Sequence, residues 1–457
     1  MEKNTSGAKR SSFTGKIGFV LAAAGSAVGL GNIWRFPYLA AKYGGGMFLL
    51  VYVALSVTFG FSLMIVEIAI GRKSGKSAIA AFESFDKRFK FLGILASAVP
   101  FLILPYYSVI GGWVLKYFAG FATGYAQDMA GSDYFGSYIS TVGEPLLWFA
   151  VFIGVTALVV LFGVEKGIEK VSRVLMPMLV FLILGISVYT VAFTEGAWEG
   201  VIYYVKPNFS RFSLMTVVAA VGQLFYSMSL AMGVMITFGS YMKKDISIEK
   251  SVKHIEVFDT AVAFLSGLMI IPAVFAFSGG DESALGQGPG LMFVTLPKVF
   301  EYMPGGEIVG SVFFFMVMLA ALTSSVSLME TVVSILMDKL KLSRRQSCFV
   351  ILVLSALLGI PSSLGYSVWS ELRIFGMQIL DFFDFFANSI MMPIIAFITC
   401  IFAGYIIEQG IIEAEVARGG KFKMKGAYRI IVRYAAPICI LAILVSSILG
   451  VMGILQI

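Results

Sequence analysis

Long apolar stretches, separated by short polar or charged ones, run along the whole chain. A helix needs about 20 apolar residues to cross a bilayer, and eleven stretches approach or exceed that length. The pattern therefore predicts an all-α membrane protein with eleven transmembrane helices. They cover residues 16–41, 45–71, 90–121, 145–163, 168–193, 212–242, 252–279, 308–339, 346–364, 372–405 and 429–456.

Positive charges fall almost entirely on one side of this arrangement. Of the 34 Lys and Arg residues, 27 lie in the amino-terminal tail and alternate loops, whereas the intervening loops hold only Lys206, Arg211 and Lys298. Because the cytoplasmic loops of membrane proteins are rich in Lys and Arg, the N-terminus is predicted to be cytoplasmic. An odd number of helices then puts the C-terminus outside.

Composition indicates the same class of protein. Hydrophobic residues make up 58% of the 457 residues and charged residues 13%, which predicts a single multi-pass domain over residues 1–457, in contact with the lipid of the cell inner (plasma) membrane. The net charge of +7 then reflects topology, and we expect no nucleic-acid partner.

The centre of the first stretch is too polar for a plain membrane anchor. Residues 25–37 read Gly-Ser-Ala-Val-Gly-Leu-Gly-Asn-Ile-Trp-Arg-Phe-Pro. Glycine weakens a helix, and an Arg in lipid costs roughly 3 kcal/mol or more. We interpret this run as a helix interrupted near the middle of the bilayer, with its free backbone groups facing a cavity. Gly25 and Gly29 alone would also fit a helix-packing motif.

A second interruption falls in the sixth stretch, where residues 222–233 read Gly-Gln-Leu-Phe-Tyr-Ser-Met-Ser-Leu-Ala-Met-Gly. Breaks at matching positions of two halves are typical of transporters that bind their substrate between inverted repeats. We therefore predict a five-plus-five inverted repeat over about 16–193 and 212–405, with discontinuous helices 1 and 6. The last helix, 429–456, would be peripheral.

Several carboxyl and hydroxyl groups lie inside predicted helices. Asp259 lies one to two turns inside the seventh helix, and an intramembrane acid is a functional candidate unless the interface hydrates it. Glu67 is a similar acid that could instead hydrogen-bond broken backbone. Thr323 and Ser324 offer adjacent oxygen atoms suited to a small cation, although such hydroxyls often bond their own helix.

Two residues weaken the fifth helix. Gly167 destabilises it through backbone entropy, and Pro177 removes a backbone hydrogen bond. The pair predicts either a segment that can unwind or a simple kink.

Sequence signatures of enzymes are missing. Residues 71–77 imitate a phosphate-binding loop, but only three residues separate their glycines, where that loop needs four. His254 is the only histidine, which argues against an intramembrane hydrolase. We expect no enzymatic activity.

Together these features resemble the neurotransmitter:sodium symporter family, in particular bacterial members with the LeuT-type fold. The resemblance covers residues 10–440 and rests mainly on residues 25–37, 222–233 and 322–325. It implies a sodium-coupled symporter that imports neutral hydrophobic L-amino acids, including aromatic ones, by alternating access. We expect a monomer or a weak dimer. A non-transporting amino-acid sensor and an ion channel of the same fold are the alternatives.

The resemblance also implies roles for individual residues. The substrate would contact Ser26, Ala27, Leu30, Gly31, Ile103, Tyr107, Tyr226, Ser227, Ser229, Met232, Ser324 and Leu328. Two sodium ions are expected, the first at Ala27, Asn32, Ser227 and Asp259 and the second at Gly25, Val28, Ala320, Thr323 and Ser324. Arg35 with Asp384 would form the outer gate, Arg10 with Asp338 and Phe13 the inner gate, and Gly167 with Pro177 the hinge.

At several of these positions the chain departs from the family's usual pattern. Phe13 stands where Trp is usual, Tyr226 where Phe is usual, and Ala231-Met232-Gly233 where Gly-x-Gly is usual. Asp259 stands where Asn is common, with Ala263 one turn later. A fixed carboxylate at this position predicts transport that is independent of chloride. Asp259 is also expected to take up a proton after sodium leaves, which would give proton antiport.

Overall fold

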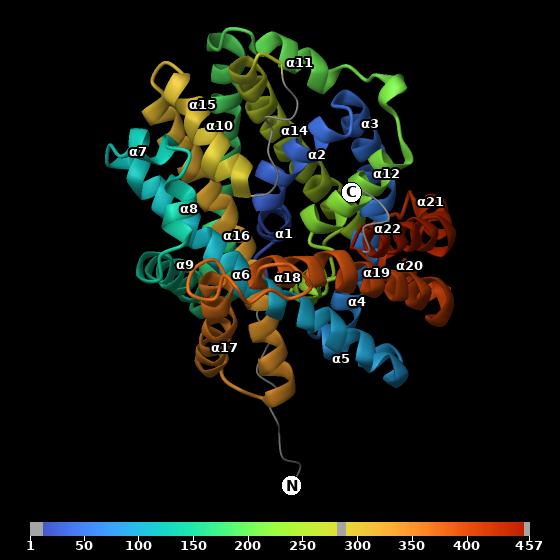
Figure 1. The fold of residues 1–457 in the computed structure, drawn as a ribbon. Coiled ribbons are helices and arrows are strands. Elements are labelled where there is room, and N and C mark those ends of the chain that lie inside the picture. Colours follow the sequence, from blue (N-terminus) through green and yellow to red (C-terminus); the bar gives the residue numbers. More distant parts are fainter. Residues whose placement is uncertain (1–11, 281–288, 452–457) are drawn as a thin grey trace.

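The computed structural model describes residues 12–280 and 289–451 (Figure 1). The described residues form helices and no β-strand. The first half holds α1 (Lys16–Ala27), α2 (Phe36–Lys42), α3 (Gly46–Leu55), α4 (Phe61–Ser74), α5 (Ala78–Phe85), α6 (Lys90–Ala122), α7 (Ala126–Ala130), α8 (Tyr134–Ile139), α9 (Gly143–Leu161), α10 (Lys170–Phe193) and α11 (Ala197–Val205). The second half holds α12 (Leu214–Ser227), α13 (Val234–Ser240), α14 (Ile248–Ser278), α15 (Leu296–Tyr302), α16 (Gly306–Leu340), α17 (Arg344–Leu364), α18 (Ile379–Phe385), α19 (Met392–Ile401), α20 (Gln409–Ala417), α21 (Lys425–Ile430) and α22 (Ala436–Val451).

Within the described ranges, nine helical segments are each long and apolar enough to cross a membrane. Some consist of two helices in line, as α3 and α4 are, joined by the π-helical turn Ser56–Gly60. Two further spans are broken. The first consists of α1 and the segment Gly31–Lys42, bent by 56°, and the sixth of α12 and α13, separated by residues 228–233. These continuous and broken spans correspond to the eleven predicted helices.

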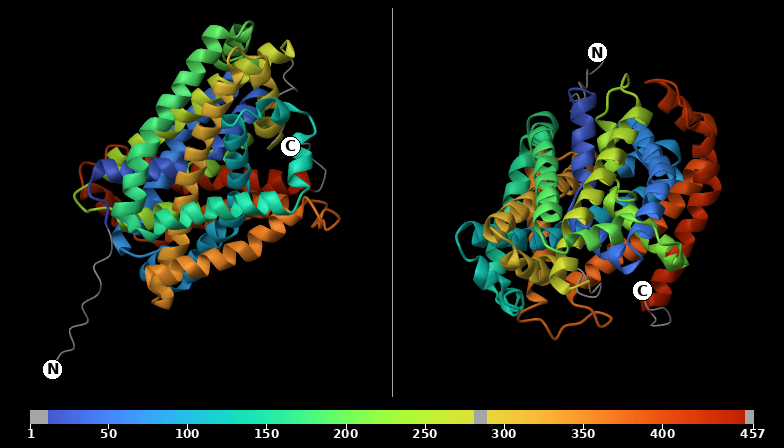
Figure 2. Two further views of the ribbon diagram at one scale, coloured as in Figure 1. Left: turned by 90° about the vertical axis from the view of Figure 1, so that its left-hand side faces the viewer. Right: turned by 90° about the horizontal axis from the view of Figure 1, so that it is seen from above.

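The first span lies at the centre of the molecule (Figure 1). α1 packs against α10, α14 and α16, and α2 packs against α14 and α12. The last helices form one edge of the molecule (Figure 2), where α22 packs against α19 and α12. The broken helices are therefore covered by other helices on several sides, as irregular backbone at membrane depth requires.

Candidate functional site

The first span is interrupted near its middle. α1 ends at Ala27, and Val28 has an extended conformation (φ −75°, ψ 108°) while its N–H still donates to the carbonyl of Ala24 (2.7 Å). The helical path resumes at Leu30 and continues through Gly31–Arg35 into α2. Because helix ends leave backbone groups without intrahelical partners, both C=O and N–H groups are available at this break.

The sixth span is interrupted over residues 228–233. Ser229 (φ 52°) and Ala231 (φ 61°) have left-handed backbone conformations there, which are unfavourable for residues with a Cβ. The buried carboxylate of Glu67 accepts the N–H of Ala231 (2.6 Å). Glu67 therefore hydrogen-bonds broken backbone, the structural alternative that the sequence left open for it.

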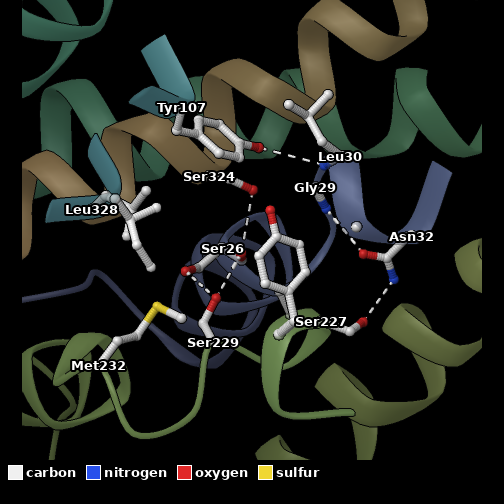
Figure 3. A pocket seen from close by; sticks show the side chains of 14 residues that line it. Ser26, Gly29, Leu30, Asn32, Tyr107, Ser227, Ser229, Met232, Ser324 and Leu328 are labelled. Carbon is white, nitrogen blue, oxygen red and sulfur yellow. Dashed lines mark hydrogen bonds between the residues drawn. The ribbon is translucent and has the colours of Figure 1, made fainter. Parts of the chain in front are cut away.

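A cavity with an empty volume of about 380 Å³ lies between the two breaks (Figure 3). All twelve residues predicted to contact the substrate line it, together with Gly29 and Asn32. None of these fourteen lining side chains carries a charge.

One part of the cavity is formed by the start of the second half-helix. The N–H of Leu30 donates to the hydroxyl of Tyr107 (3.4 Å). A Cβ on Gly31 would lie 2.4 Å from the Tyr226 ring, and a Cβ on Gly29 would lie 2.6 Å from the Ser324 hydroxyl. Glycine at both positions lets side chains approach the backbone here. The start of a helix favours an anion, because its first N–H groups have no partner within the helix and because it is the positive end of the helix dipole.

The rest of the cavity is less polar. The hydroxyl of Ser229 donates to the carbonyl of Ser26 (2.9 Å), and the hydroxyl of Ser26 donates to that of Ser229 (3.1 Å). Ile103, Met232 and Leu328 are buried and supply apolar surface. This region suits an uncharged, largely apolar ligand group.

A buried polar cluster adjoins the cavity, formed by Asn32 after the first break, Ser227 at the end of α12 and Asp259 in α14. Oδ1 of Asp259 accepts the amide of Asn32 and the hydroxyl of Ser227, both at 2.8 Å. Tyr52 of α3 donates to Oδ2 (3.2 Å). These three donors stabilise the carboxylate in its fully buried position. Ala27, the fourth residue predicted for the first ion, lines the adjoining cavity.

The chemistry of this cluster fits a small, hard cation. The carbonyl of Ala27, the amide of Asn32, the hydroxyl of Ser227 and the carboxylate of Asp259 all contain oxygen, the ligand atom that such cations prefer. In this arrangement the amide nitrogen of Asn32 faces Asp259, while its Oδ1 accepts the N–H of Gly29 (3.1 Å). A half-turn of the amide would present its oxygen to the cluster instead.

A second group of oxygen atoms lies where α16 passes the first break. The Ser324 hydroxyl lies 3.1 Å from the carbonyl oxygen of Val28 and 3.4 Å from that of Gly25. The hydroxyl of Thr323 lies 3.0 Å from the carbonyl oxygen of Ala320. The Ser324 hydroxyl is thus brought to the carbonyls of the first break, whereas the Thr323 hydroxyl bonds its own helix, the alternative that the sequence left open. The five residues predicted for the second ion offer three carbonyls and two hydroxyls without a formal charge.

The two residues predicted to form the outer gate contact different partners. Among the described residues, Arg35 and Asp384 form no ion pair with each other. The Arg35 guanidinium lies over the Tyr226 ring, 5.1 Å from its centroid, where cation–π attraction stabilises it. Asp384 accepts the hydroxyl of Tyr106 (3.0 Å) and the amide of Asn388 (2.7 Å). Gating by Arg35 and Asp384 stays a prediction.

Two of the predicted inner-gate residues, Phe13 and Asp338, lie just before the start of α1 and near the end of α16. Phe13 is fully buried, with its ring edge-on to Phe19 at 5.6 Å. Asp338 accepts the N–H of Ser77 (2.8 Å). Arg10, the third predicted member, lies outside the described residues, so the gate itself stays a prediction.

The predicted hinge spans an irregular part of the fifth span. Gly167 lies in the π-helical turn Val164–Glu169, and Pro177 lies inside α10. A Cβ on Gly167 would lie 2.2 Å from the carbonyl oxygen of Val159, so only glycine fits without a shift. An irregular turn followed by a missing hydrogen bond weakens the segment between them, as a hinge would require.

Two polar residues beside the site were not predicted to take part. Tyr52 donates to Asp259, and Gln223 donates to the carbonyl of Gly31 (3.0 Å). Nothing in the sequence distinguishes Tyr52 from an ordinary core aromatic residue. An amide alone in an apolar stretch was a usable signal for Gln223.

The chain is similar to known proteins over nearly its whole length. The model of the sodium:neurotransmitter symporter family matches residues 10–127 and 125–454. The chain is 35% identical over 440 residues to the uncharacterized sodium-dependent transporter YhdH of Bacillus subtilis. This match covers 95% of this chain and 96% of that protein. It is 31% identical to a sodium-dependent transporter of Haemophilus influenzae, with 97% and 99% of the two chains covered.

A solved structure is similar over nearly the whole chain. The crystal structure of MhsT in complex with L-phenylalanine superimposes with a TM-score of 0.87 and 38% identity, covering 96% of this chain and 100% of that one. More distantly, the chain is 27% identical to the sodium- and chloride-dependent GABA transporter ine of Drosophila melanogaster, over 88% of this chain and 47% of that protein.

Proposed function

The chain belongs to the sodium:neurotransmitter symporter family, and we propose that it imports neutral hydrophobic L-amino acids, including aromatic ones, together with sodium by alternating access. Membership of this family makes it a multi-pass, sodium-dependent membrane transporter and not an enzyme. Its fold is the all-α fold of that family, with discontinuous first and sixth helices.

The observation that carries the substrate proposal is the uncharged cavity between the two breaks. The N–H groups of Leu30 and Gly31, with the hydroxyl of Tyr107, suit a carboxylate. Backbone carbonyls and the Ser229 hydroxyl suit an ammonium group. The remaining surface is apolar and contains Met232, whose flexible side chain adapts to different shapes. The L-phenylalanine bound to MhsT supports a ligand of this kind.

Two oxygen clusters support a stoichiometry of two sodium ions per substrate. The first cluster adjoins the cavity, so an ion there would lie close to the substrate carboxylate. Ion and substrate would then each raise the affinity for the other, because coupling between two binding sites is reciprocal. This coupling lets a sodium gradient drive accumulation of the amino acid.

The Asp259 carboxylate supports transport that does not need chloride. Positive charge in a buried site needs a compensating negative charge, and Asp259 supplies it. After sodium leaves, the buried carboxylate has no cation beside it, so we propose that a proton replaces sodium on the return step. Antiport would raise the pH inside proteoliposomes during uptake, and a pH-sensitive dye in the lumen measures it.

We further propose that the chain lies in the cell inner (plasma) membrane as a monomer or weak dimer, with a cytoplasmic N-terminus and an external C-terminus. The distribution of Lys and Arg supports this orientation. Labelling of single added cysteines in 3–9 and 452–457 by an impermeant reagent on intact cells tests it.

Transport by purified protein in proteoliposomes tests the main proposal. We expect labelled leucine or phenylalanine to accumulate only under an inward sodium gradient, and hydrophobic amino acids to compete best among the twenty. Preference for Gly, GABA, Lys or Glu would contradict the substrate class. Counterflow separates the alternatives. In this assay, unlabelled amino acid inside the proteoliposomes exchanges for labelled amino acid outside, with no sodium gradient. A sensor gives no uptake of label, and a channel does not accumulate label against its concentration difference.

A further inference from the structure

A carboxylate from another helix lies beside the cytoplasmic start of α1. Oε2 of Glu169 accepts the N–H of Thr14 (2.8 Å), and Oε1 accepts the Thr14 hydroxyl. The first turn of α1 has no acidic residue of its own, and its N-cap, Gly15, has no side chain. A helix N-terminus favours nearby negative charge, so Glu169 stabilises this end of α1 across the helix interface.

The Glu169 carboxylate is held in a closely fitted position. Arg173, one turn later in α10, donates to Oε1 of Glu169 and to the hydroxyl of Thr14, both at 2.6 Å. In α1, a Cβ on Gly18 would lie only 2.0 Å from Oε1. The Glu169 side chain is 2% exposed, so its charge depends on these donors.

Glu169 also belongs to the irregular part of the fifth span. It is the last residue of the π-helical turn Val164–Glu169, which contains Gly167. Unwinding of this turn would therefore move the carboxylate away from Thr14. The far end of α1 carries the Gly25 carbonyl of the second oxygen cluster, and Val28, directly after the helix, supplies another carbonyl. A change at Glu169 thus acts on the helix that forms part of that cluster.

We infer that Glu169 is a positioning residue that holds the inner half of the first span closed while the fifth span is wound, and releases it when the turn at Gly167 unwinds. The inference rests on the proposed alternating-access function and names the contact by which the fifth span acts on the first. It assigns no ion or substrate contact to Glu169.

Hydrogen–deuterium exchange of the full chain tests this coupling in sodium and in sodium-free potassium buffer. In the parent we expect slow exchange of amides 12–20 in sodium and faster exchange in potassium. Glu169→Gln weakens a charge-assisted contact, so exchange of these amides in sodium should rise about tenfold. Exchange in α6 and α16 should not change. Glu165→Gln, an exposed residue of the same turn, is the matched control and should behave as the parent.

A second variant approaches the same contact from α1. Gly18→Ala leaves the carboxylate intact but displaces it, so it should reproduce the faster exchange of Glu169→Gln. Both variants should raise the half-saturating sodium concentration about tenfold, while the order of competition among amino acids stays the same. Glu169→Asp, which keeps the charge, should restore part of the sodium affinity.

Unchanged exchange of amides 12–20 in Glu169→Gln would overturn the inference, as would an equal effect of Glu165→Gln. Faster exchange throughout the molecule in both Glu169→Gln and Gly18→Ala would mean a role in folding alone, which also overturns it. A parent that shows no sodium-dependent uptake would contradict the proposed function, whatever the exchange of α1 shows.

Discussion

The amide nitrogen of Asn32 lies 2.8 Å from Oδ1 of Asp259, and this contact joins the break in the first span to the interior of α14. Ser227, at the break in the sixth span, bonds the same carboxylate oxygen (2.8 Å). One fully buried carboxylate therefore connects both interrupted helices. Any change at this carboxylate would therefore affect both breaks.

Asp259→Asn should make transport depend on chloride. The substitution keeps the size of the side chain but removes the only formal negative charge of the cluster. We expect parent uptake to be the same in chloride and gluconate, and uptake by Asp259→Asn in gluconate to fall at least about tenfold, as for loss of a charged partner worth about 1.5–3 kcal/mol. Uptake of labelled substrate in the two media measures it.

Glu256→Gln is the control for loss of a buried carboxylate on the same helix. Glu256 is buried one turn away and accepts the Ser56 hydroxyl (3.3 Å), outside the Asn32 cluster. Transport by the Glu256→Gln variant should stay independent of chloride. A parent that stops without chloride, or an Asp259→Asn variant that is fully active in gluconate, contradicts the role given to Asp259.

Removing both hydroxyls of the second cluster should abolish accumulation. Thr323→Val with Ser324→Ala leaves three carbonyl oxygens at this site, too few to replace the water around a small cation. We expect the internal concentration of substrate to reach but not exceed the external one under a sodium gradient. Ser325→Ala is the control, because the Ser325 hydroxyl bonds Thr156 (3.0 Å), away from the cluster. Normal accumulation by the double variant would rule out the second site.

The breaks could be predicted from the sequence because their residues are costly in an ordinary membrane helix. Gly31, Asn32 and Arg35 follow one another within an apolar stretch, and no plain anchor explains all three. The number and order of the spans followed from hydrophobic length alone. In the part of the chain that the structure describes, nine continuous spans, the bent first span and the short pair α12 and α13 lie where the eleven helices were predicted. The local sequence was therefore enough to predict the order of the spans and the position of the breaks.

Contacts between distant residues could not be predicted in this way. Glu169 meets Thr14 across 155 positions of the chain, and neither residue is unusual in its own segment. Arg35 stacks on Tyr226 without a direct bond to Asp384, which depends on how closely the two broken helices approach. Such details follow from packing, and only the structure fixes them.

Gly31→Ala should impair substrate binding. The new Cβ would lie 2.4 Å from the ring of Tyr226, which lines the cavity. Overpacking of a close contact costs about 1–3 kcal/mol, so the half-saturating substrate concentration should rise by a factor between about 5 and 150. Gly222→Ala in α12 is the control, because nothing lies within 4 Å of its added Cβ. Equal effects of the two substitutions would contradict this account of the close approach.

Ala231→Gly should be less destabilising than a glycine substitution in a regular helix. Ala231 has φ 61°, a conformation that costs a residue with a Cβ about 1–2 kcal/mol. Glycine relieves that cost, which offsets the roughly 0.5–1 kcal/mol of extra entropy that it gives the unfolded chain. Ala220→Gly is the matched control, since Ala220 is equally buried but lies in the regular helix α12. We expect Ala220→Gly to lower the free energy of unfolding by about 1–2 kcal/mol more than Ala231→Gly does. Thermal denaturation of both variants in one detergent measures the difference. Equal losses would mean that the left-handed backbone at Ala231 carries no cost.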